Sequence, residues 1–433
     1  MRIIHIAAGA GSMYCGACAR DINLIRGLLA RGHDVEVIPL YTPLRIEGDD
    51  ALPVTRIFYS GINVFLQQAL ALFRITPAFL DRLFESQALL KWVSRFAIET
   101  RAEGLGPMTV SVLAGKDGRQ RKELAKLLAY LEHSARPDVV TLTNSMLSGI
   151  APEVQARLHV PVVCMLQGED TFVEAMPEPH RSQARELMQR NACAIDLFIS
   201  PGEAYAARMA AYLDVPAERI RVIRAGVDTA AFRREGTRPT APFVIGYLSV
   251  ITPSKGLDVL VDAFIYLAKV EQRDLQLHVA GKVLNEEYWQ AQLRRIAEAQ
   301  LLERFVYYDE VDLAGKIDFL HRCSAFAFPT RLPESRAMAA LEALAAGLPL
   351  IAPDAGVLPE IVHQTDGGLL FPQGDARALA REIARLVDDP QLADALGRQG
   401  AAGVARDYAA SRMAEETLAL YERLVVLSEP RFT

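Results

Sequence analysis

The chain has 433 residues, more than one hydrophobic core usually supports, so we expect two domains of about 200 residues each. Apolar residues make up 51% of the chain and charged residues 23%, which excludes a disordered protein. The net charge of -6 argues against broad, charge-driven binding to nucleic acid or to an anionic membrane.

The sequence indicates a protein of the cytoplasm. No apolar run reaches the roughly 18 to 20 residues that span a bilayer. The apolar run at the N-terminus carries one positive charge and is interrupted by His5, which is typical of a first strand rather than of a signal peptide. Five cysteines in so long a chain fit reduced thiols better than a disulfide framework.

Short apolar runs alternate with longer helical patterns, which predicts an α/β protein with two doubly wound parallel sheets. The predicted strands of the first half are Ile3–Ala8, Val35–Leu40, Val139–Thr143, Val160–Leu166 and Leu197–Ser200. Those of the second half are Phe243–Ser249, Leu275–Ala280, Phe305–Tyr308, Ala325–Phe328 and Leu348–Ala352.

The pattern divides into two Rossmann-like domains. We expect the first at residues 1–228 and the second at 243–406, joined by a charged, Gly- and Pro-containing linker at 229–242. A final helical segment, 407–433, can cross back to the first domain. Such a pair of domains makes a cleft where the carboxyl ends of both sheets face each other, and ligands bind at those ends.

The segment Gly61–Gly104 interrupts this alternation with a helical pattern that is apolar on several faces. It fits an inserted helical pair packed on the first domain. It also fits a wall of an acceptor cleft or a surface for an apolar acceptor. Its basic residues leave peripheral contact with a membrane surface open.

The most informative motif is the stretch Phe326–Pro349, which reads FAFPTRLPESRAMAALEALAAGLP. It predicts a strand, a loop bounded by prolines, and a helix that begins near Glu334 and ends at Gly347. Eight residues along such a helix, Glu342 lies about 12 Å further on, so the two carboxylates can contact two parts of one extended ligand.

The backbone amides at the start of that helix can bind an anion. Helix amides in the first turn have no intrahelical acceptor and favour anions. On this prediction the free amides of Arg336, Ala337 and Met338 point into the same space as the two carboxylates and can bind an anion such as a diphosphate.

With these two glutamates and the Leu-Glu-Ala and Ala-Gly-x-Pro run that follows, the chain resembles the retaining GT-B glycosyltransferases of family four, the glycosyl transferases of group 1. The resemblance implies two Rossmann-like domains and transfer of a sugar from a nucleotide-sugar donor. It places Glu334 at the hydroxyls of the donor sugar and Glu342 at the ribose.

The resemblance extends to Phe243–Asp258, the first strand of the second domain and its loop to the next helix. In the family a basic pair in this loop holds the donor diphosphate, and Lys255 matches its lysine. The position of the arginine is Val250, so Arg331 or Arg336 would have to supply the second charge.

In the first half, a glycine-rich loop follows the first strand and precedes a helix at Ala19–Arg31. The family places such a loop against the diphosphate and the acceptor, and Gly11 and Gly16 are the positions where a side chain would block that approach. The pair Cys15 and Cys18 leaves a thiol redox function open, because Cys-x-x-Cys at a helix start lowers a thiol pKa.

A further candidate site follows the strand at Val160–Leu166. Where many family members have a histidine, this chain has Gln167, whose amide hydrogen-bonds a sugar hydroxyl but cannot exchange a proton near neutral pH. Glu169 and Asp170 are then either the acidic groups near the acceptor or polar caps of the next helix.

Two later stretches, Pro353–Val362 and Asp366–Phe371, resemble the elements that close the second domain in the family. We interpret both as turns and core packing.

We therefore expect a metal-independent retaining glycosyltransferase, similar to hexosyltransferases and serving carbohydrate biosynthesis, with no cofactor beyond its nucleotide-sugar co-substrate. UDP is the expected nucleotide on base rates, and the acceptor is a saccharide, lipid-linked or small-molecule hydroxyl compound; no nucleic-acid partner is expected. The departures at Val250 and Gln167 leave a non-catalytic nucleotide- or sugar-binding protein as the alternative, and the two cysteines leave a thiol oxidoreductase.

Overall fold

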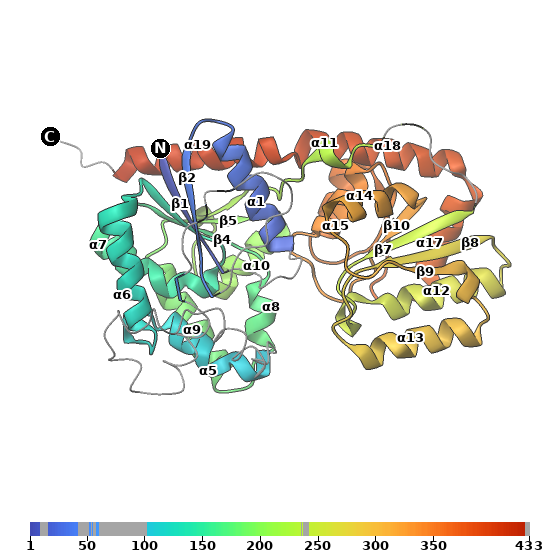
Figure 1. The fold of residues 1–433 in the computed structure, drawn as a ribbon, viewed down its shortest axis with the longest axis horizontal. Coiled ribbons are helices and arrows are strands. Elements are labelled where there is room, and N and C mark those ends of the chain that lie inside the picture. The colour runs from blue at the N-terminus through green and yellow to red at the C-terminus, as the bar shows by residue number, and fades with distance from the viewer. Residues whose placement is uncertain are drawn as a thin grey trace, which may run out of the picture. The chain divides into compact units, whose positions relative to one another are not determined.

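The computed structural model describes residues 1–8, 16–41, 52, 54, 58–59, 102–234, 236 and 242–428. The chain divides into two compact units. Unit 1 comprises Met1–Ile223 together with Ala414–Thr433, and unit 2 comprises Arg224–Met413. In each unit the described strands form a parallel sheet whose strand order reverses direction beside the first strand of that unit, so each unit is a doubly wound α/β domain (Figure 1).

The described strands of unit 1 form one parallel sheet in the order β2-β1-β3-β4-β5-β6. Their bounds are β1 Arg2–Ala7, β2 Asp34–Pro39, β3 Val139–Leu142, β4 Val162–Met165, β5 Leu197–Ser200 and β6 Ile220–Val222. The six strands run parallel, with helical crossovers between successive strands, and nearly every strand residue is buried.

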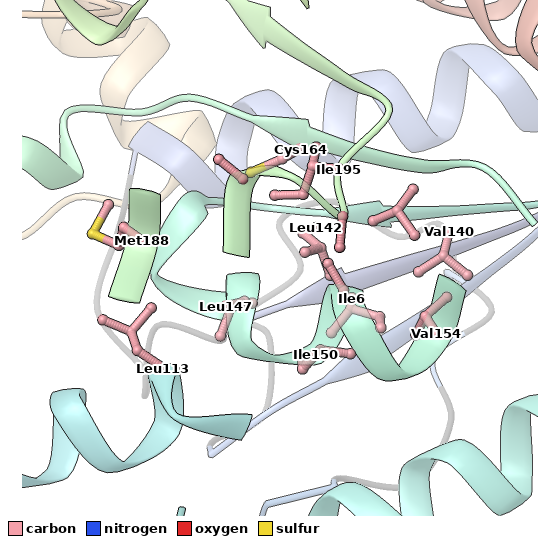
Figure 2. Close-up of a cluster of buried hydrophobic side chains, with 14 of the residues drawn as sticks. Ile6, Leu113, Val140, Leu142, Leu147, Ile150, Val154, Cys164, Met188 and Ile195 are labelled. Carbon is pink, nitrogen blue, oxygen red and sulfur yellow. The ribbon is translucent and has the colours of Figure 1, made fainter. Parts of the chain in front are cut away.

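Helices cover this sheet. They are α1 Gly16–Leu29, α5 Ala102–Leu113, α6 Arg121–Tyr130, α7 Ala151–Leu158, α8 Glu169–Glu174, α9 His180–Ala192, α10 Glu203–Leu213 and the later part of α19 Ala410–Ser428. Short helical turns lie at Gly115–Asp117, Leu131–Ala135, Ser145–Ile150 and Ala217–Arg219. Figure 2 shows part of the core, where aliphatic side chains of β1 and β3 meet Leu147, Ile150 and Val154.

Unit 2 repeats the arrangement, with described strands in the order β12-β11-β10-β7-β8-β9. The strands are β7 Phe243–Leu248, β8 Leu275–Ala280, β9 Phe305–Tyr307, β10 Ala325–Ala327, β11 Leu350–Pro353 and β12 Gly368–Phe371. The helices are α11 Thr229–Phe232, α12 Leu257–Lys269, α13 Glu286–Glu298, α14 Leu313–Arg322, α15 Met338–Ala345, α16 Leu358–Thr365, α17 Ala376–Asp388 and α18 Pro390–Asp407, with short turns at Pro253–Lys255 and Leu302–Arg304.

The sheet of unit 2 separates two hydrophobic cores. Successive residues of a strand point to opposite faces, so Val244 packs in one core and Ile245 in the other. Figure 1 shows α12 and α13 on one face of the sheet and α14 and α15 on the other. Because both faces are covered, the strands are apolar almost throughout, as parallel sheets require.

The predicted α/β class and the ten predicted strands are present, with ends that differ by at most two residues. Two strands were missed. β6 is a short edge strand whose middle residue, Arg221, is exposed, so it has no continuous apolar run. β12 lies within the stretch Asp366–Phe371, and its interpretation as turns was wrong, because Gly368 pairs with Leu350 and continues the sheet.

Two segments differ from the expected domain division. Unit 2 begins at Arg224, and the expected linker opens with α11, whose Phe232 is buried in the core of unit 2. Helix α19 begins in unit 2, and its residues from Ala414 belong to unit 1. Most of the expected insertion 61–104 lies outside the described residues, which resume at α5.

The junction of α19 with unit 1 is testable. Tyr421 and Thr141 are both fully buried, and their hydroxyls are 2.8 Å apart. We expect Tyr421→Phe to lower the free energy of unfolding by about 1–2 kcal/mol, because the Thr141 hydroxyl then stays buried without this partner. Urea denaturation followed by circular dichroism measures the change.

The double variant Thr141→Val with Tyr421→Phe should cost less than the sum of the two single changes, since the hydroxyls act as a pair. Tyr266→Phe, at a half-buried position on α12, is the matched control and should change stability by less than about 0.5 kcal/mol. Additive single effects would contradict the pairing.

Candidate functional site

Each sheet has one point where the chain reverses its direction of strand addition. In unit 2 this switch lies between β7 and β10, which are neighbours although β8 and β9 come between them in sequence. The loops that leave these two strands at their carboxyl ends diverge there and leave room for a ligand. Lys255 lies in the loop after β7 and Glu334 in the loop after β10.

These two predicted residues meet. The Lys255 ammonium lies 2.5 Å from a carboxylate oxygen of Glu334, and both side chains are only partly exposed, at 20% and 16%. The Thr330 hydroxyl donates a hydrogen bond to the same oxygen at 3.1 Å. The sequence-based prediction that Lys255 and Glu334 share one site therefore agrees with the geometry of unit 2.

Two glycines allow the loops to approach this closely. Gly256 follows Lys255 with φ +71°, and a Cβ there would collide with the carbonyl oxygen of Pro329. Gly356 has φ +63°, and a Cβ would lie 2.5 Å from the Glu334 carbonyl oxygen. Both positions therefore require glycine for backbone conformation and for space.

The predicted helix start was wrong. Helix α15 begins at Met338, not near Glu334. The backbone before Met338 is not helical. The Glu334 carbonyl accepts a hydrogen bond from the amide of Val357 at 2.8 Å, and Ala337 has a left-handed conformation with φ 51°. Glu334 therefore lies in a loop, and its predicted axial spacing from Glu342 does not apply.

The predicted set of anion-binding amides changes accordingly. Arg336 and Ala337 precede the helix, and of the three predicted residues Met338 alone lies within α15. The amides of Met338 and Ala339 occupy its first turn, where helix amides have no intrahelical acceptor.

Glu342 lies deeper than predicted. Its side chain is 4% exposed and accepts a hydrogen bond at 2.9 Å from Lys316 of α14, which is 1% exposed. Burial raises the pKa of the Glu342 carboxyl against the opposing effect of Lys316. Burial likewise lowers the pKa of Lys316. Breaking such a buried pair from one side is costly, because it leaves a charge without compensation.

Arg331 is committed to a carboxylate. Its guanidinium binds Asp258 at 2.5 and 2.6 Å, and the Tyr288 hydroxyl donates to the same carboxylate at 2.7 Å. Burial acts to raise the pKa of Asp258, but Arg331 and Tyr288 outweigh it and lower that pKa. Val250, at the position of the family arginine, is half-buried and carries no charge.

In unit 1 the switch lies between β1 and β3, and the loops there carry a buried polar network. The Asp21 carboxylate of α1 binds Arg20 at 2.7 Å, lies 3.3 Å from His5 of β1, and accepts from the Thr143 hydroxyl. Burial acts to raise the pKa of Asp21, but the charges of Arg20 and His5 and these hydrogen bonds hold it well below its ordinary value.

The network ends at Gln167. Its side-chain amide nitrogen donates to the Thr143 hydroxyl at 2.7 Å and to the Thr143 carbonyl. The Thr143 hydroxyl gives its only proton to Asp21 and can therefore only accept from Gln167. Both groups opposite the amide are acceptors, which fixes the NH₂ group of Gln167 toward Thr143.

Glu169 and Asp170 are buried at the start of α8 and bind protein donors. Glu169 accepts from the Ser145 amide and hydroxyl and from the Gln167 amide, at 2.6–2.9 Å. Asp170 accepts from the Tyr205 hydroxyl at 2.9 Å and lies 2.5 Å from Arg208. Burial and the two carboxylates raise the pKa of Tyr205 far above its ordinary value.

The polar-cap interpretation of Glu169 and Asp170 was wrong, because the N-cap residue of α8 is Gly168 and no side chain caps this helix. The carboxylates tie the end of β3, the end of β4 and helix α10 together.

Several site residues were not predicted. The sequence contains a signal for two of them, because Asp21 follows the glycine-rich loop and Thr143 ends a predicted strand. The signal for Lys316 is weaker: it is a lysine on a helix whose other face is apolar. Thr330 lies in the loop between β10 and Glu334 and carries no motif of its own.

Some predicted positions lie outside the described residues, namely Gly11 and Cys15. Gly16 is the first residue of α1, and Cys18 is a partly buried cysteine on that helix. Within the described ranges, no cluster of three or more His, Cys, Asp or Glu side chains is placed to hold a metal ion. In the same ranges, no helix has the length and apolarity needed to span a membrane.

Two parallel α/β units with a site at a switch point define the GT-B class of fold. Known proteins agree over nearly the whole chain: residues 228–402 match the family described as glycosyl transferases group 1, and residues 22–226 match the glycosyl transferase 4-like domain. The chain belongs to the group 1 glycosyltransferases, the family that its sequence motifs resemble.

One similar protein is the lipopolysaccharide core biosynthesis mannosyltransferase LpsB of Rhizobium meliloti, which is 29% identical over 59% of this chain and 72% of its own length. The chain spans only 52–58% of the length of several further curated relatives. These comparisons favour neither a non-catalytic binding protein nor a thiol oxidoreductase.

Among solved structures, HepE of Anabaena in complex with UDP is similar with a TM-score of 0.67 and 17% identity, over 98% of this chain and 100% of that one. The sucrose-phosphate synthase of Thermosynechococcus elongatus is similar with a TM-score of 0.71 and 18% identity, over 99% and 100%. At these identities the likeness shows the fold.

The Asp21 network gives a pH-dependent prediction. Because the pKa of Asp21 is lower in the folded chain than its ordinary value of 3.8, its stabilisation is present above pH 3.8 and is lost as the pH falls below that value. We expect Asp21→Asn to lower the free energy of unfolding at pH 7 by about 2–4 kcal/mol.

Denaturant unfolding of the variant and of the unchanged protein at pH 7, 4 and 3 measures this effect. The difference should shrink at acidic pH, where the unchanged protein loses the same contribution. Asp214→Asn, at an exposed position, is the matched control. A difference that stays constant from pH 7 to pH 3 would show that the Asp21 charge is not the cause.

Proposed function

We propose that this protein is a retaining glycosyltransferase that moves a hexosyl group from a nucleoside diphosphate sugar to a hydroxyl group of its acceptor. The observation that carries the proposal is the meeting of Lys255 and Glu334, 79 residues apart, at the switch point of unit 2 in a member of this family. A cation for the diphosphate and a carboxylate for sugar hydroxyls are the two groups such a donor needs side by side.

The donor site extends along α15. Lys255 and the first-turn amides of Met338 and Ala339 stabilise the departing diphosphate, the ammonium by charge and the amides by the helix dipole. Glu334 accepts hydrogen bonds from the donor sugar. Glu342, held by Lys316, is assigned to the ribose. UDP is our proposed nucleotide, since the similar HepE structure contains UDP.

The acceptor side is assigned to unit 1, at Gln167. An amide orients a sugar hydroxyl but cannot take its proton near neutral pH. In the step we propose, the acceptor oxygen bonds to the anomeric carbon, the bond from that carbon to the phosphate oxygen breaks, and the phosphate oxygen takes the acceptor proton on the same face. Glu169 and Asp170 position this loop through the contacts described above.

We further propose that the reaction needs no metal or other cofactor, because the ammonium and the helix dipole supply the charge stabilisation. The acceptor is a saccharide or a lipid-linked saccharide, as the similar LpsB acts in lipopolysaccharide core biosynthesis. A cytoplasmic location fits the free thiols Cys164 and Cys193. Any peripheral membrane contact through 61–104 concerns mostly residues outside the described ranges, which resume at 102.

The decisive experiment incubates purified protein with UDP-glucose, GDP-mannose and ADP-glucose, and follows thermal stabilisation and release of the nucleoside diphosphate, with and without cell extract as a source of acceptor. We expect one donor to stabilise the protein and to release its diphosphate mainly when extract is present. Stabilisation with no release in any extract would favour a binding protein, and no response to any donor would contradict the donor site.

A variant tests the role of Lys255. We expect Lys255→Ala to weaken binding of that donor at least about tenfold, because a charge-assisted contact to phosphate is lost. Isothermal titration calorimetry measures the affinity. Lys269→Ala, exposed at the other end of α12, is the matched control for loss of one lysine and should bind as the unchanged protein does. Equal affinities of the two variants would remove Lys255 from the site.

A further inference from the structure

The cation assigned to the diphosphate is already paired in the ligand-free protein. The Lys255 ammonium lies 2.5 Å from the Glu334 carboxylate, and both groups are more than three-quarters buried. Partial burial strengthens such a pair relative to an exposed one. A diphosphate that binds Lys255 must therefore compete with a carboxylate of the protein.

The neighbouring cation is less available for exchange. Arg331 makes two hydrogen bonds to Asp258 and a third, at 3.2 Å, to the carbonyl of Pro253. A planar guanidinium held in this way loses several bonds when it moves. Lys255 has a flexible stem and a compact ammonium with three donors, so it reorients at lower cost.

Glu334 needs a new partner when Lys255 turns to phosphate. The Thr330 hydroxyl still donates to it, but a partly buried carboxylate beside an anionic phosphate is destabilised by repulsion and by lost solvation. The hydroxyls of a bound sugar can donate to Glu334 and replace the ammonium. A nucleoside diphosphate without its sugar brings no such donors.

We propose that Lys255 and Glu334 form an exchange pair that discriminates the intact nucleotide sugar from the nucleoside diphosphate product. The donor phosphate takes Lys255, and the donor sugar compensates Glu334. After transfer the sugar is gone, Glu334 competes again for Lys255, and the product is released. This inference rests on the proposed function and adds to it a reason for product release.

The test compares affinities for the nucleotide found in the donor experiment, with and without its sugar: UDP and UDP-glucose, GDP and GDP-mannose, or ADP and ADP-glucose. Glu334→Gln removes the competing charge and keeps the shape. We expect this variant to bind the nucleoside diphosphate about three- to tenfold more tightly than the unchanged protein does, although its transfer activity falls. Its preference for the sugar nucleotide over the diphosphate should shrink.

Glu303→Gln is the matched control, because it removes one exposed carboxylate away from the donor site. Glu303 lies just before the amino end of β9, an edge strand of the same sheet. It should leave both affinities unchanged. Glu334→Ala is a second variant that should raise diphosphate affinity in the same direction. Melting temperatures verify that each variant is folded.

The outcomes separate the two proposals. If the unchanged protein binds no nucleotide sugar, the proposed function fails, and this inference fails with it. If the unchanged protein binds and transfers, but neither Glu334 variant gains affinity for the diphosphate, the exchange pair alone is wrong. An equal gain in the Glu303 control would assign the effect to net charge and would also overturn the pair.

Discussion

Parallel strand pairing is the constraint on which the rest of this structure depends. Successive parallel strands need a crossover connection between them. The carboxyl ends of all strands in the sheet therefore lie along one edge, and the loops that follow the strands begin there. In unit 2 this brings Lys255 and Glu334 together although 79 residues separate them. In unit 1 it brings Thr143, after β3, to Gln167, after β4. The chemistry of both sites follows from where strands end.

The two sites differ in how they hold charge. At the unit 2 site, Lys255 and Glu334 are within reach of solvent, and their ion pair is formed by side chains that a ligand can engage. At the unit 1 site, Asp21, Glu169 and Asp170 are almost fully buried, and their hydrogen bonds join separate elements of the fold. The first arrangement suits exchange of partners, and the second suits rigid orientation of a neutral amide such as Gln167.

The sequence predicted the α/β class, ten strands and a donor site that contains both Lys255 and Glu334, because apolar runs and family motifs are local patterns. It did not predict that the two side chains form an ion pair. It missed β6, whose exposed Arg221 interrupts the apolar pattern, and it misplaced the start of α15. The helix start depends on contacts with Gly356 and Val357, which no local pattern reports. The sequence also did not reveal the partner of Glu342, because Lys316 lies on a different helix and contacts Glu342 only once the two helices have packed.

One buried hydrogen bond joins residues that are far apart in the chain, and it bears on the order in which the chain folds. Tyr421 of α19 completes the buried contact with Thr141 of β3, 280 residues earlier. Ribosomes deliver the chain from its N-terminus, so all of unit 2 emerges before unit 1 acquires its last helix. During synthesis the surface that α19 covers stays open while unit 2 folds. Unit 1 is therefore the unit whose buried surface is completed last, although its first strand is made first.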